Sequence, residues 1–402
     1  MKGKKREISS VAILFSGGPA PSANAVISSL TLSLLNERIK PIGVMRGFEF
    51  LEDFDLNNPY SLIEGVHYKY LDYSVSGMRN KKGIILKTSR ANPGKGIKNM
   101  EDLKDSEKNK RLMNIIRALE YLRAEVLITI GGDDTLKTAN YLRHLGAKVI
   151  HIPKTIDNDY YGIPWTFGYW TAVEEMSKIL LNLRADAEST DSYFVVELMG
   201  RKAGWLTYAA GIAGEAVKMI SLEDIEKGKE LDIDGIVDEL SEIIIQRERD
   251  FKNYGVFCVA EGLAEILPER LKPKETDKHG NVIYGKAEVG RIIARGLEKA
   301  YHKKMGRSKK IVYKQVGYET RSGSPVSFDV VLGSMLGYGA FKLMEASKFG
   351  HMVSVDENFN IRAIPFDELI DSKTLLTKLR NVPKGSDFYE LKESLSYKPI
   401  IK

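Results

Sequence analysis

The stretch Val11-Ala12-Ile13-Leu14-Phe15-Ser16-Gly17-Gly18-Pro19-Ala20-Pro21 decides the fold of this chain. Its first five residues are all apolar, which predicts a buried strand. The glycines and prolines that follow predict a turn, and an apolar-periodic helix is expected from about Ser22 to Leu35. A buried strand that turns through glycines into a helix is the opening unit of a doubly wound α/β fold.

The same order of elements recurs along the chain. Each predicted strand ends on polar residues or glycines, and in open parallel sheets the carboxyl ends of the strands carry the ligand site. The sequence therefore predicts two doubly wound, Rossmann-like α/β domains with mainly parallel sheets and the active site in the cleft between them. The later strands are expected at 126–130, 148–152, 193–198, 255–260 and 312–316, and further helices at about 171–186, 203–213 and 328–345.

The length of the chain agrees with two domains, because 402 residues are too many for one ordinary hydrophobic core. The net charge of +6 is mild, and we interpret the basic run Lys2–Arg6 as a solvated tail rather than a nucleic-acid contact. The single cysteine, Cys258, excludes a disulfide framework within the chain and is expected to be buried. No signal peptide or membrane-length apolar stretch is found, so we expect a cytoplasmic protein with neither membrane nor nucleic acid as partner.

Glycines and acidic residues at three strand ends point to phosphate chemistry. Gly17 and Gly18 form either a phosphate cradle at a helix start or a plain tight turn. Asp133 and Asp134 follow two glycines and either attract Mg²⁺ or form a solvated turn. Asp157 and Asp159 flank Asn158 after the next strand, where one of two carboxylates near a Mg²⁺–phosphate site can act as general base on a hydroxyl.

Three cationic side chains complete the set that phosphoryl transfer needs. Lys154 would neutralise phosphate charge, and Arg90 and Arg201 can make bidentate phosphate contacts. Other chemistries fit less well, because the chain has no zinc-ligand spacing, no Gly-x-Ser-x-Gly elbow and no Gly-x-Gly-x-x-Gly in its first turn.

Five motifs, in this order and at these spacings, resemble the signatures of the phosphofructokinase family. The resemblance extends from about Val11 to Gly339. The motifs are Gly131-Gly132-Asp133-Asp134-Thr135, Pro153-Lys154-Thr155-Ile156-Asp157-Asn158-Asp159, Met199-Gly200-Arg201, Glu261-Gly262 and Tyr318-Glu319-Thr320-Arg321.

The resemblance implies a role for each motif. Asp157 is implied as the base that takes the proton of the sugar's 1-hydroxyl, with Lys154, Asp134 and Arg201 as its catalytic companions, and Asp133 as the Mg²⁺ ligand. Residues 1–168 plus about 320–365 are expected to bind the donor, and 169–319 plus about 366–402 the sugar phosphate. Implied donor contacts are Gly17, Gly18, Arg90 and Lys154; implied sugar-phosphate contacts are Thr155, Ile156, Asp157, Met199, Gly200, Arg201, Glu261, Tyr318, Glu319, Thr320 and Arg321.

Two positions decide the phosphoryl donor within this resemblance. Members that use ATP usually have glycine where Asp134 stands, and many have glycine where Lys154 stands. Aspartate adds bulk and negative charge where the α-phosphate of ATP would lie, and lysine can hold pyrophosphate. Because some ATP-using members keep the lysine, Asp134 is the stronger discriminator, and it predicts pyrophosphate as the co-substrate.

The acceptor is less well defined than the donor. ATP-type bacterial members reach a neighbouring subunit's sugar phosphate with two arginines, whose positions here hold Ser192 and Val312. Lys314 or Lys310 could substitute, although a lysine lacks the arginine fork. The resemblance implies fructose 6-phosphate as acceptor in a homodimer or homotetramer, and the two missing arginines leave sedoheptulose 7-phosphate as the alternative acceptor.

Two further functions compete with a pyrophosphate-dependent kinase. One is an ATP-dependent kinase, and the other is a non-catalytic sugar-phosphate sensor on the same fold. The chain retains both Asp133 and Asp157, and a pure sensor needs neither, so the sequence disfavours the sensor.

Overall fold

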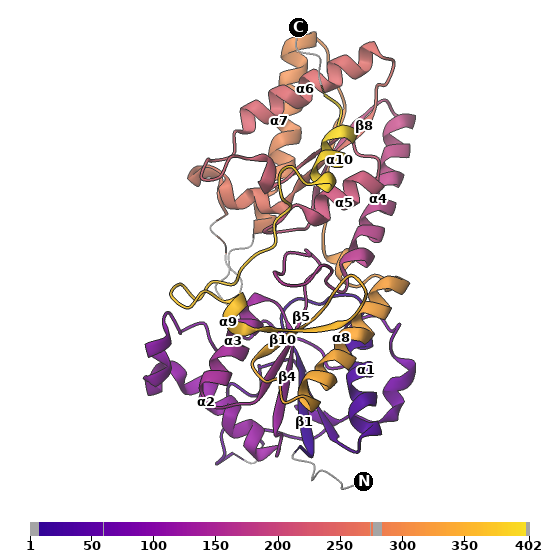
Figure 1. Ribbon diagram of the computed structural model, residues 1–402. Helices are drawn as coiled ribbons and strands as arrows, with labels where there is room; N and C mark the ends of the chain where they lie inside the picture. Colours follow the sequence, from indigo (N-terminus) through magenta and orange to yellow (C-terminus); the bar gives the residue numbers. More distant parts are fainter. Residues whose placement is uncertain (1–7, 59, 274, 276–283, 399–402) are drawn as a thin grey trace. The chain divides into compact units, whose positions relative to one another are not determined.

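A computed structural model describes the chain except for residues 1–7, 59, 274, 276–283 and 399–402 (Figure 1). The structure divides into two compact units. Unit 1 comprises 1–155, 160–170 and 324–379; unit 2 comprises 156–159, 171–323 and 380–402. The basic run Lys2–Arg6 lies outside the described residues.

Unit 1 is built on a seven-stranded sheet with the order β11-β10-β5-β4-β1-β2-β3. The five inner strands run parallel, whereas the edge strands β3 and β11 are antiparallel to their neighbours. The strands are β1 (Ser10–Phe15), β2 (Lys40–Val44), β3 (Tyr68–Tyr70), β4 (Val126–Gly131), β5 (Val149–Pro153), β10 (His351–Val355) and β11 (Ile361–Pro365).

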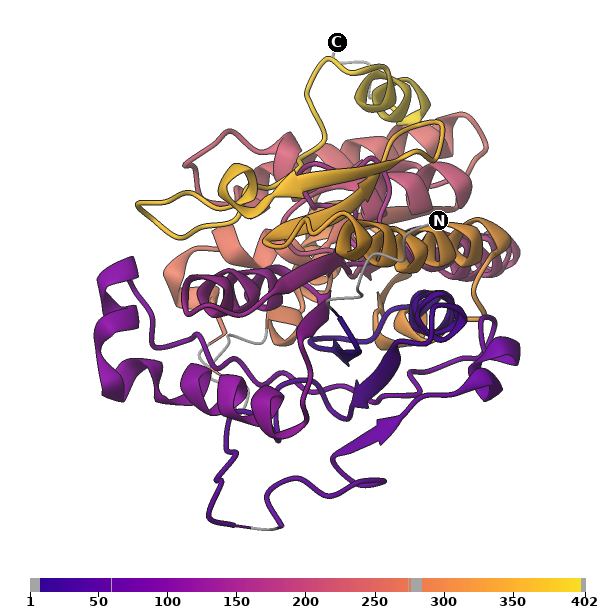
Figure 2. The ribbon, with the colours of Figure 1, turned by 60° about the horizontal axis from the view of Figure 1, so that its bottom comes forward.

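Helices cover both faces of this sheet (Figures 1 and 2). On one face α1 (Ala23–Asn36) and α8 (Ser327–Glu345) lie side by side. Their backbones are so close that a Cβ on Gly337 would stand 2.3 Å from the Val26 carbonyl oxygen. Glycine there lets the two backbones approach closely. The other face carries α2 (Ser106–Tyr121) and α3 (Asp133–His144), and the short α9 (Phe366–Leu369) follows β11.

Unit 2 has a four-stranded, all-parallel sheet with the order β7-β8-β6-β9. Helices α6 and α7 pack on one face, where Leu240, Ile244, Ile293 and Leu297 are fully buried with the sheet. The elements are α4 (Tyr169–Ser189), β6 (Tyr193–Leu198), α5 (Trp205–Ala213), β7 (Lys218–Ile220), α6 (Ile233–Arg249), β8 (Gly255–Ala260), α7 (Val289–Met305), β9 (Ile311–Val316) and α10 (Asp387–Leu395).

The predicted fold class is confirmed, and every predicted strand is present within a residue or two of its expected bounds. Cys258 is fully buried in β8, as expected. The chain's last passage to unit 2 comes at 379–380, later than the position near 365 that the sequence suggested. The cause is α9, whose Phe366 is fully buried in unit 1 and donates its backbone N–H to the Gly350 carbonyl at 3.0 Å. No helix among the described residues is long and apolar enough to cross a membrane.

Candidate active site

The turn after β1 is joined to the segment that carries Arg90. Gly17 donates its N–H to the Ser89 carbonyl at 2.8 Å, and the Thr88 hydroxyl donates to the Gly17 carbonyl at 2.7 Å. Gly17 has φ +87°, a conformation that favours glycine. These bonds place the segment that carries the exposed Arg90 next to the glycine turn.

The side chain of Lys154 lies against the same turn. Its backbone N–H continues the β4–β5 pairing by donating to the Gly131 carbonyl at 2.9 Å. The side chain is nearly buried, and its Nζ lies 3.2 Å from the point that a Cβ on Gly17 would occupy. Nζ also lies 5.7 Å from the centre of the Phe15 ring. Unit 1 therefore brings a lysine ammonium and a glycine turn together at the β1–β4–β5 edge.

Asp133 and Asp134 form the first turn of α3, directly after β4. Gly132 precedes them as the N-cap. Only glycine fits at position 131 before it, because a Cβ there would meet Thr135 Oγ1 at 2.3 Å. The Asp134 side chain is 60% exposed and lies 3.9 Å from Lys137 Nζ. A helix N-terminus stabilises carboxylates and phosphates alike, so this edge suits a phosphate–cation pair.

A buried chain of hydrogen bonds lies next to the carboxyl ends of β4 and β5. The His151 ring lies 2.9 Å from Thr129 Oγ1 and 3.1 Å from the Tyr160 hydroxyl. Tyr160 in turn reaches the Gly131 carbonyl at 3.5 Å. Burial lowers the pKa of His151 to about 3, so the ring is neutral near pH 7 and adds no charge beside Lys154.

In unit 2 the predicted sugar-phosphate motifs follow three neighbouring strands. Leu198 at the end of β6 pairs with Ala260 of β8 and Val316 of β9, so the residues after these three lie together. The Gly262 N–H donates to the Gly200 carbonyl at 3.0 Å, and a Cβ on Gly262 would stand 2.2 Å from the Arg201 carbonyl oxygen. The Glu261-Gly262 and Met199-Gly200-Arg201 motifs therefore form one backbone cluster.

Asp157 belongs to unit 2 although it follows β5 of unit 1. Its Oδ2 accepts the backbone N–H of Arg201 at 3.4 Å. The next residue, Asn158, is fully buried and has φ +55°, an uncommon conformation for a residue with a side chain. The strained turn thus presents the Asp157 carboxylate to the Met199–Arg201 loop.

Electrostatic interactions connect Glu261 with three other predicted residues. Burial raises the pKa of the Glu261 carboxyl, and the Asp157 carboxylate raises it further, while Arg321 and Arg201 oppose the shift. The Arg321 guanidinium lies 5.3 Å from the ring centre of the exposed Tyr318. Asp157, Glu261, Arg201 and Arg321 therefore form one charged cluster in unit 2.

Some predicted contacts face inward in this structure. Thr320 is fully buried and its hydroxyl donates to the Gly317 carbonyl at 2.6 Å, while Ile156 is 4% exposed. Ser192 is fully buried and pairs with the Thr190 hydroxyl at 2.8 Å, directly before β6. Val312 lies near the start of β9, so both positions are at the amino ends of their strands, away from Met199 and Tyr318.

Sequence reasoning missed one residue at this site, Arg380. Its guanidinium and its backbone N–H donate to the carbonyls of Asn158 and Asp159, at 3.2 and 2.8 Å. Backbone carbonyls leave no signature in a sequence, so no motif indicated this contact.

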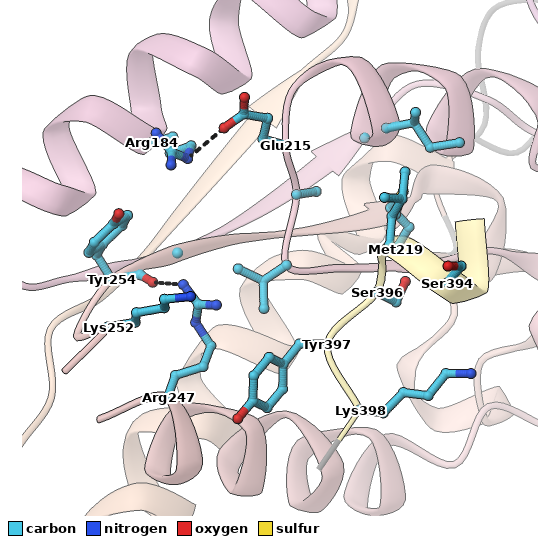
Figure 3. A pocket seen from close by; sticks show the side chains of 16 residues that line it. Arg184, Glu215, Met219, Arg247, Lys252, Tyr254, Ser394, Ser396, Tyr397 and Lys398 are labelled. Carbon is cyan, nitrogen blue, oxygen red and sulfur yellow. Dashed lines mark hydrogen bonds and ion pairs between the residues drawn. The ribbon is translucent and has the colours of Figure 1, made fainter. Parts of the chain in front are cut away.

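A separate cavity of about 560 Å³ lies within unit 2 (Figure 3). Arg184 pairs with Glu215 at 3.1 Å on one side of it, and Arg247 donates to the Tyr254 carbonyl at 2.8 Å on another. Residues 394–398 of the C-terminal segment form a further wall. None of the predicted site residues lines this cavity.

Comparison with known proteins identifies the class. The profile described as Phosphofructokinase matches residues 10–344, which is more than half of the chain. The chain belongs to the phosphofructokinase family.

Individual relatives carry two kinds of name. A pyrophosphate--fructose 6-phosphate 1-phosphotransferase of Thermotoga maritima is 35% identical over 94% of this chain and 88% of its own length. One of Naegleria fowleri is 31% identical over 96% and 87%. An ATP-dependent 6-phosphofructokinase of Spirochaeta thermophila is 31% identical over 92% of both chains. The crystal structure of a pyrophosphate-dependent phosphofructokinase from Marinobacter aquaeolei shares the fold, with a TM-score of 0.67 and 17% identity over 97% of this chain and 92% of that one.

Proposed function

We propose that this protein reversibly transfers a phosphoryl group from pyrophosphate to the 1-hydroxyl of fructose 6-phosphate, giving fructose 1,6-bisphosphate and phosphate. The observation that carries the proposal is the placement of Lys154 against the Gly17 turn, together with Asp134 in the first turn of α3, which follows β4. The names of the two pyrophosphate-dependent relatives support the same donor.

The donor half of the proposal rests on charge and space in unit 1. Pyrophosphate is compact and highly charged, and an ammonium, a glycine turn and a helix N-terminus are the groups that stabilise such an anion. The exposed Asp134 carboxylate repels any further phosphate and occupies space beside the N-terminus of α3. Lys154 would also stabilise phosphate as the leaving group.

The acceptor half rests on the charged cluster in unit 2. Asp157 would take the proton of the sugar hydroxyl, as a general base within hydrogen-bond reach of it. The Arg201 N–H, at 3.4 Å from Asp157 Oδ2, keeps one carboxylate oxygen in place. Arg201 and Arg321 would bind the phosphate of the sugar. Met199, Gly200 and Glu261 would contact the rest of the sugar phosphate. Catalysis requires both sets of residues to act on one pair of substrates.

A Mg²⁺ site fits the residues of unit 1. Mg²⁺ is usually held by one or two carboxylates plus substrate phosphates, and Asp133 offers one carboxylate at the end of β4. No group of three or more His, Cys, Asp or Glu able to hold a metal is found in the described ranges, which agrees with an ion that arrives with the phosphates. When bound, Mg²⁺ would neutralise charge on the transferred phosphoryl group.

Asp134 variants test the choice of donor. Asp134→Ala removes bulk and charge, whereas Asp134→Asn removes charge alone and keeps the bulk. We expect Asp134→Ala to gain turnover or binding with ATP, and Asp134→Asn to gain less. Steady-state rates and ATP titrations of the three proteins measure this; no gain in either variant contradicts a role for space and charge at this position.

An ATP-dependent enzyme is the second candidate, because relatives at 31% identity carry that name. The acceptor has its own alternative in sedoheptulose 7-phosphate. A matrix of two donors and two acceptors, assayed with the unmodified protein, separates all four combinations. Assembly into a homodimer or homotetramer in the cytoplasm stays a prediction.

A further inference from the structure

The segment that begins at Arg380 lies behind the turn that carries Asp157. Arg380 Nη1 donates to the Asn158 carbonyl at 3.2 Å, and its backbone N–H donates to the Asp159 carbonyl at 2.8 Å. One residue therefore binds two consecutive carbonyls of the turn. It comes from a part of the chain beyond residue 344, where the match to the family profile ends.

The turn needs such support because its backbone is strained. Asn158 has φ +55°, a left-handed conformation that asparagine adopts more readily than most residues with a side chain but that is still less favourable than ordinary helical or extended backbone. Strained conformations persist only where the surroundings hold them. A hydrogen bond to a charged donor is stronger than one between neutral groups, so the guanidinium is well suited to hold this turn.

Arg380 also binds the start of α5, which follows the Met199–Arg201 loop. Its guanidinium lies 4.1 Å from the ring centre of Trp205, and its carbonyl accepts the Trp205 Nε1–H at 2.8 Å. Phe388 of α10 stacks on the same indole with 5.3 Å between ring centres, and α10 lies close to α5 in Figure 1. Trp205 is thereby enclosed by the C-terminal segment.

The Glu223 carboxylate also joins the C-terminal segment to the start of α5. Glu223 Oε1 accepts the Gly204 N–H at 2.9 Å and the Val382 N–H at 3.0 Å. Gly204 is the N-cap of α5, and Arg201, three residues earlier, donates its N–H to Asp157. The C-terminal segment thus holds both partners of the Asp157–Arg201 hydrogen bond.

We propose that Arg380 is a positioning residue for the Asp157 carboxylate. Arg380 acts through the backbone of the turn and through Trp205. The inference rests on the proposed role of Asp157 as general base. A displacement of the carboxylate by about 1 Å lowers turnover by up to about 100-fold, because proton transfer depends on geometry.

Three variants and one control isolate this role. Arg380→Met keeps an unbranched side chain and removes the donors, and Arg380→Lys returns one charged donor. Arg247→Met is the matched control, because Arg247 also donates to a carbonyl and lies 5.7 Å from an aromatic ring, that of Tyr397 in the C-terminal segment. Trp205→Phe keeps a ring under the guanidinium and removes the Nε1–H donor.

Steady-state kinetics of fructose 1,6-bisphosphate formation gives the first readout. For Arg380→Met we expect kcat to fall about 10- to 100-fold, with the KM values for both substrates changed by less than about threefold. Arg380→Lys recovers part of kcat, Trp205→Phe loses less than Arg380→Met, and Arg247→Met retains kcat. Unchanged kcat in Arg380→Met, or equal losses in Arg380→Met and Arg247→Met, overturns the inference.

Hydrogen exchange gives a readout that does not depend on turnover. The amide of residue 380 is bonded to the Asp159 carbonyl. Its exchange should accelerate in Arg380→Met and return toward the wild-type rate in Arg380→Lys, while melting temperatures stay close. Exchange that is equal in all variants refutes the positioning role.

The two proposals fail in distinguishable ways. Wild-type protein that uses ATP and not pyrophosphate contradicts the proposed donor, and the same variants are then compared with ATP. Wild-type protein with the proposed activity and fully active Arg380→Met contradicts only the inference about Arg380.

Discussion

The two units of this protein differ in the structure that follows the carboxyl ends of their parallel strands. In unit 1 the strands β1 and β4 pass through glycines into the helices α1 and α3. The buried Lys154 lies against the turn after β1. In unit 2 the strands β8 and β9 pass into short 3₁₀ helices, Glu261–Ile266 and Tyr318–Arg321. Those 3₁₀ helices carry the side chains of Glu261, Glu319 and Arg321 in place of an α-helix N-terminus.

This difference matches the two substrates of the proposed reaction. Helix N-termini and glycine turns recognise phosphate oxygens through the backbone and need few side chains. A sugar hydroxyl has to be oriented and deprotonated, which requires side chains with defined positions. Changes in unit 1 should therefore affect the donor, and changes in unit 2 the acceptor and the chemical step.

The largest effect is expected in unit 2 from Asp157→Asn. Asparagine keeps the shape and cannot take a proton, so kcat should fall by about 10²- to 10⁴-fold. Binding of fructose 6-phosphate, measured by calorimetry, should be largely retained. Asp191→Asn is the control, because Asp191 is exposed and precedes the amino end of β6. Full activity of Asp157→Asn would falsify its role as base.

A pH-dependent stability difference is expected from Glu197, also in unit 2. The Glu197 side chain is fully buried in β6 and accepts the Gly290 N–H at 2.9 Å. Burial raises the pKa of its carboxyl from 4.5 to about 7. The folded state therefore keeps a proton that the unfolded state has released, and stability falls as the pH rises from about 4.5 to about 7.

Glu197→Gln removes this titration while keeping an acceptor for Gly290. Relative to the variant, the wild type should lose up to about 3 kcal/mol of folding free energy between pH 4.5 and pH 7, with no further loss above that range. Melting curves of both proteins from pH 4.5 to 8 measure the difference. A difference that stays constant over this range contradicts the burial effect.

In unit 1, Lys154→Met should weaken use of pyrophosphate by about 100-fold in kcat/KM, since a charged donor aimed at the transferred group is lost. Binding of fructose 6-phosphate should be unchanged, because the proposed acceptor contacts lie in unit 2. The control is Lys148→Met, an exposed lysine just before the opposite end of the same strand. Equal losses for pyrophosphate and for the sugar would erase the contrast between the units.

The smallest effect concerns the glycine turn. Gly17→Ala places a Cβ 3.2 Å from Lys154 Nζ at φ +87°. Gly146→Ala has similar backbone strain, at φ +97°, with nothing within 4 Å of its Cβ. Both should cost about 1 kcal/mol of stability, and only Gly17→Ala should also raise the KM for pyrophosphate. The two variants behaving alike in both assays would argue against a donor site at Gly17.

Much of the fold could be predicted because the signals are local. Apolar runs identified β1, β4, β5, β6 and β8, and the rule that ligands bind at strand ends grouped the motifs that each unit brings together. Cys258 was predicted to be buried for the same reason. Trp165 and Trp170, whose ring centres lie 5.5 Å apart, form part of an aromatic cluster with Tyr169 and Phe328.

The rest depends on contacts between distant segments. The strand β11 pairs antiparallel with β10, and the later passage at 379–380 follows from the burial of α9; no motif indicates either of them. Arg380 binds carbonyls more than 200 residues away, at Asn158 and Asp159. Thr320 belongs to a motif, yet its hydroxyl is used by the backbone of its own turn.

The choice of phosphoryl donor is the central claim, and one assay tests it most directly. The purified protein is supplied with fructose 6-phosphate and Mg²⁺, and with either pyrophosphate or ATP as the only phosphoryl donor. We predict that fructose 1,6-bisphosphate forms with pyrophosphate and not with ATP, and that phosphate drives the reverse reaction. Turnover with ATP and none with pyrophosphate would contradict the proposed function.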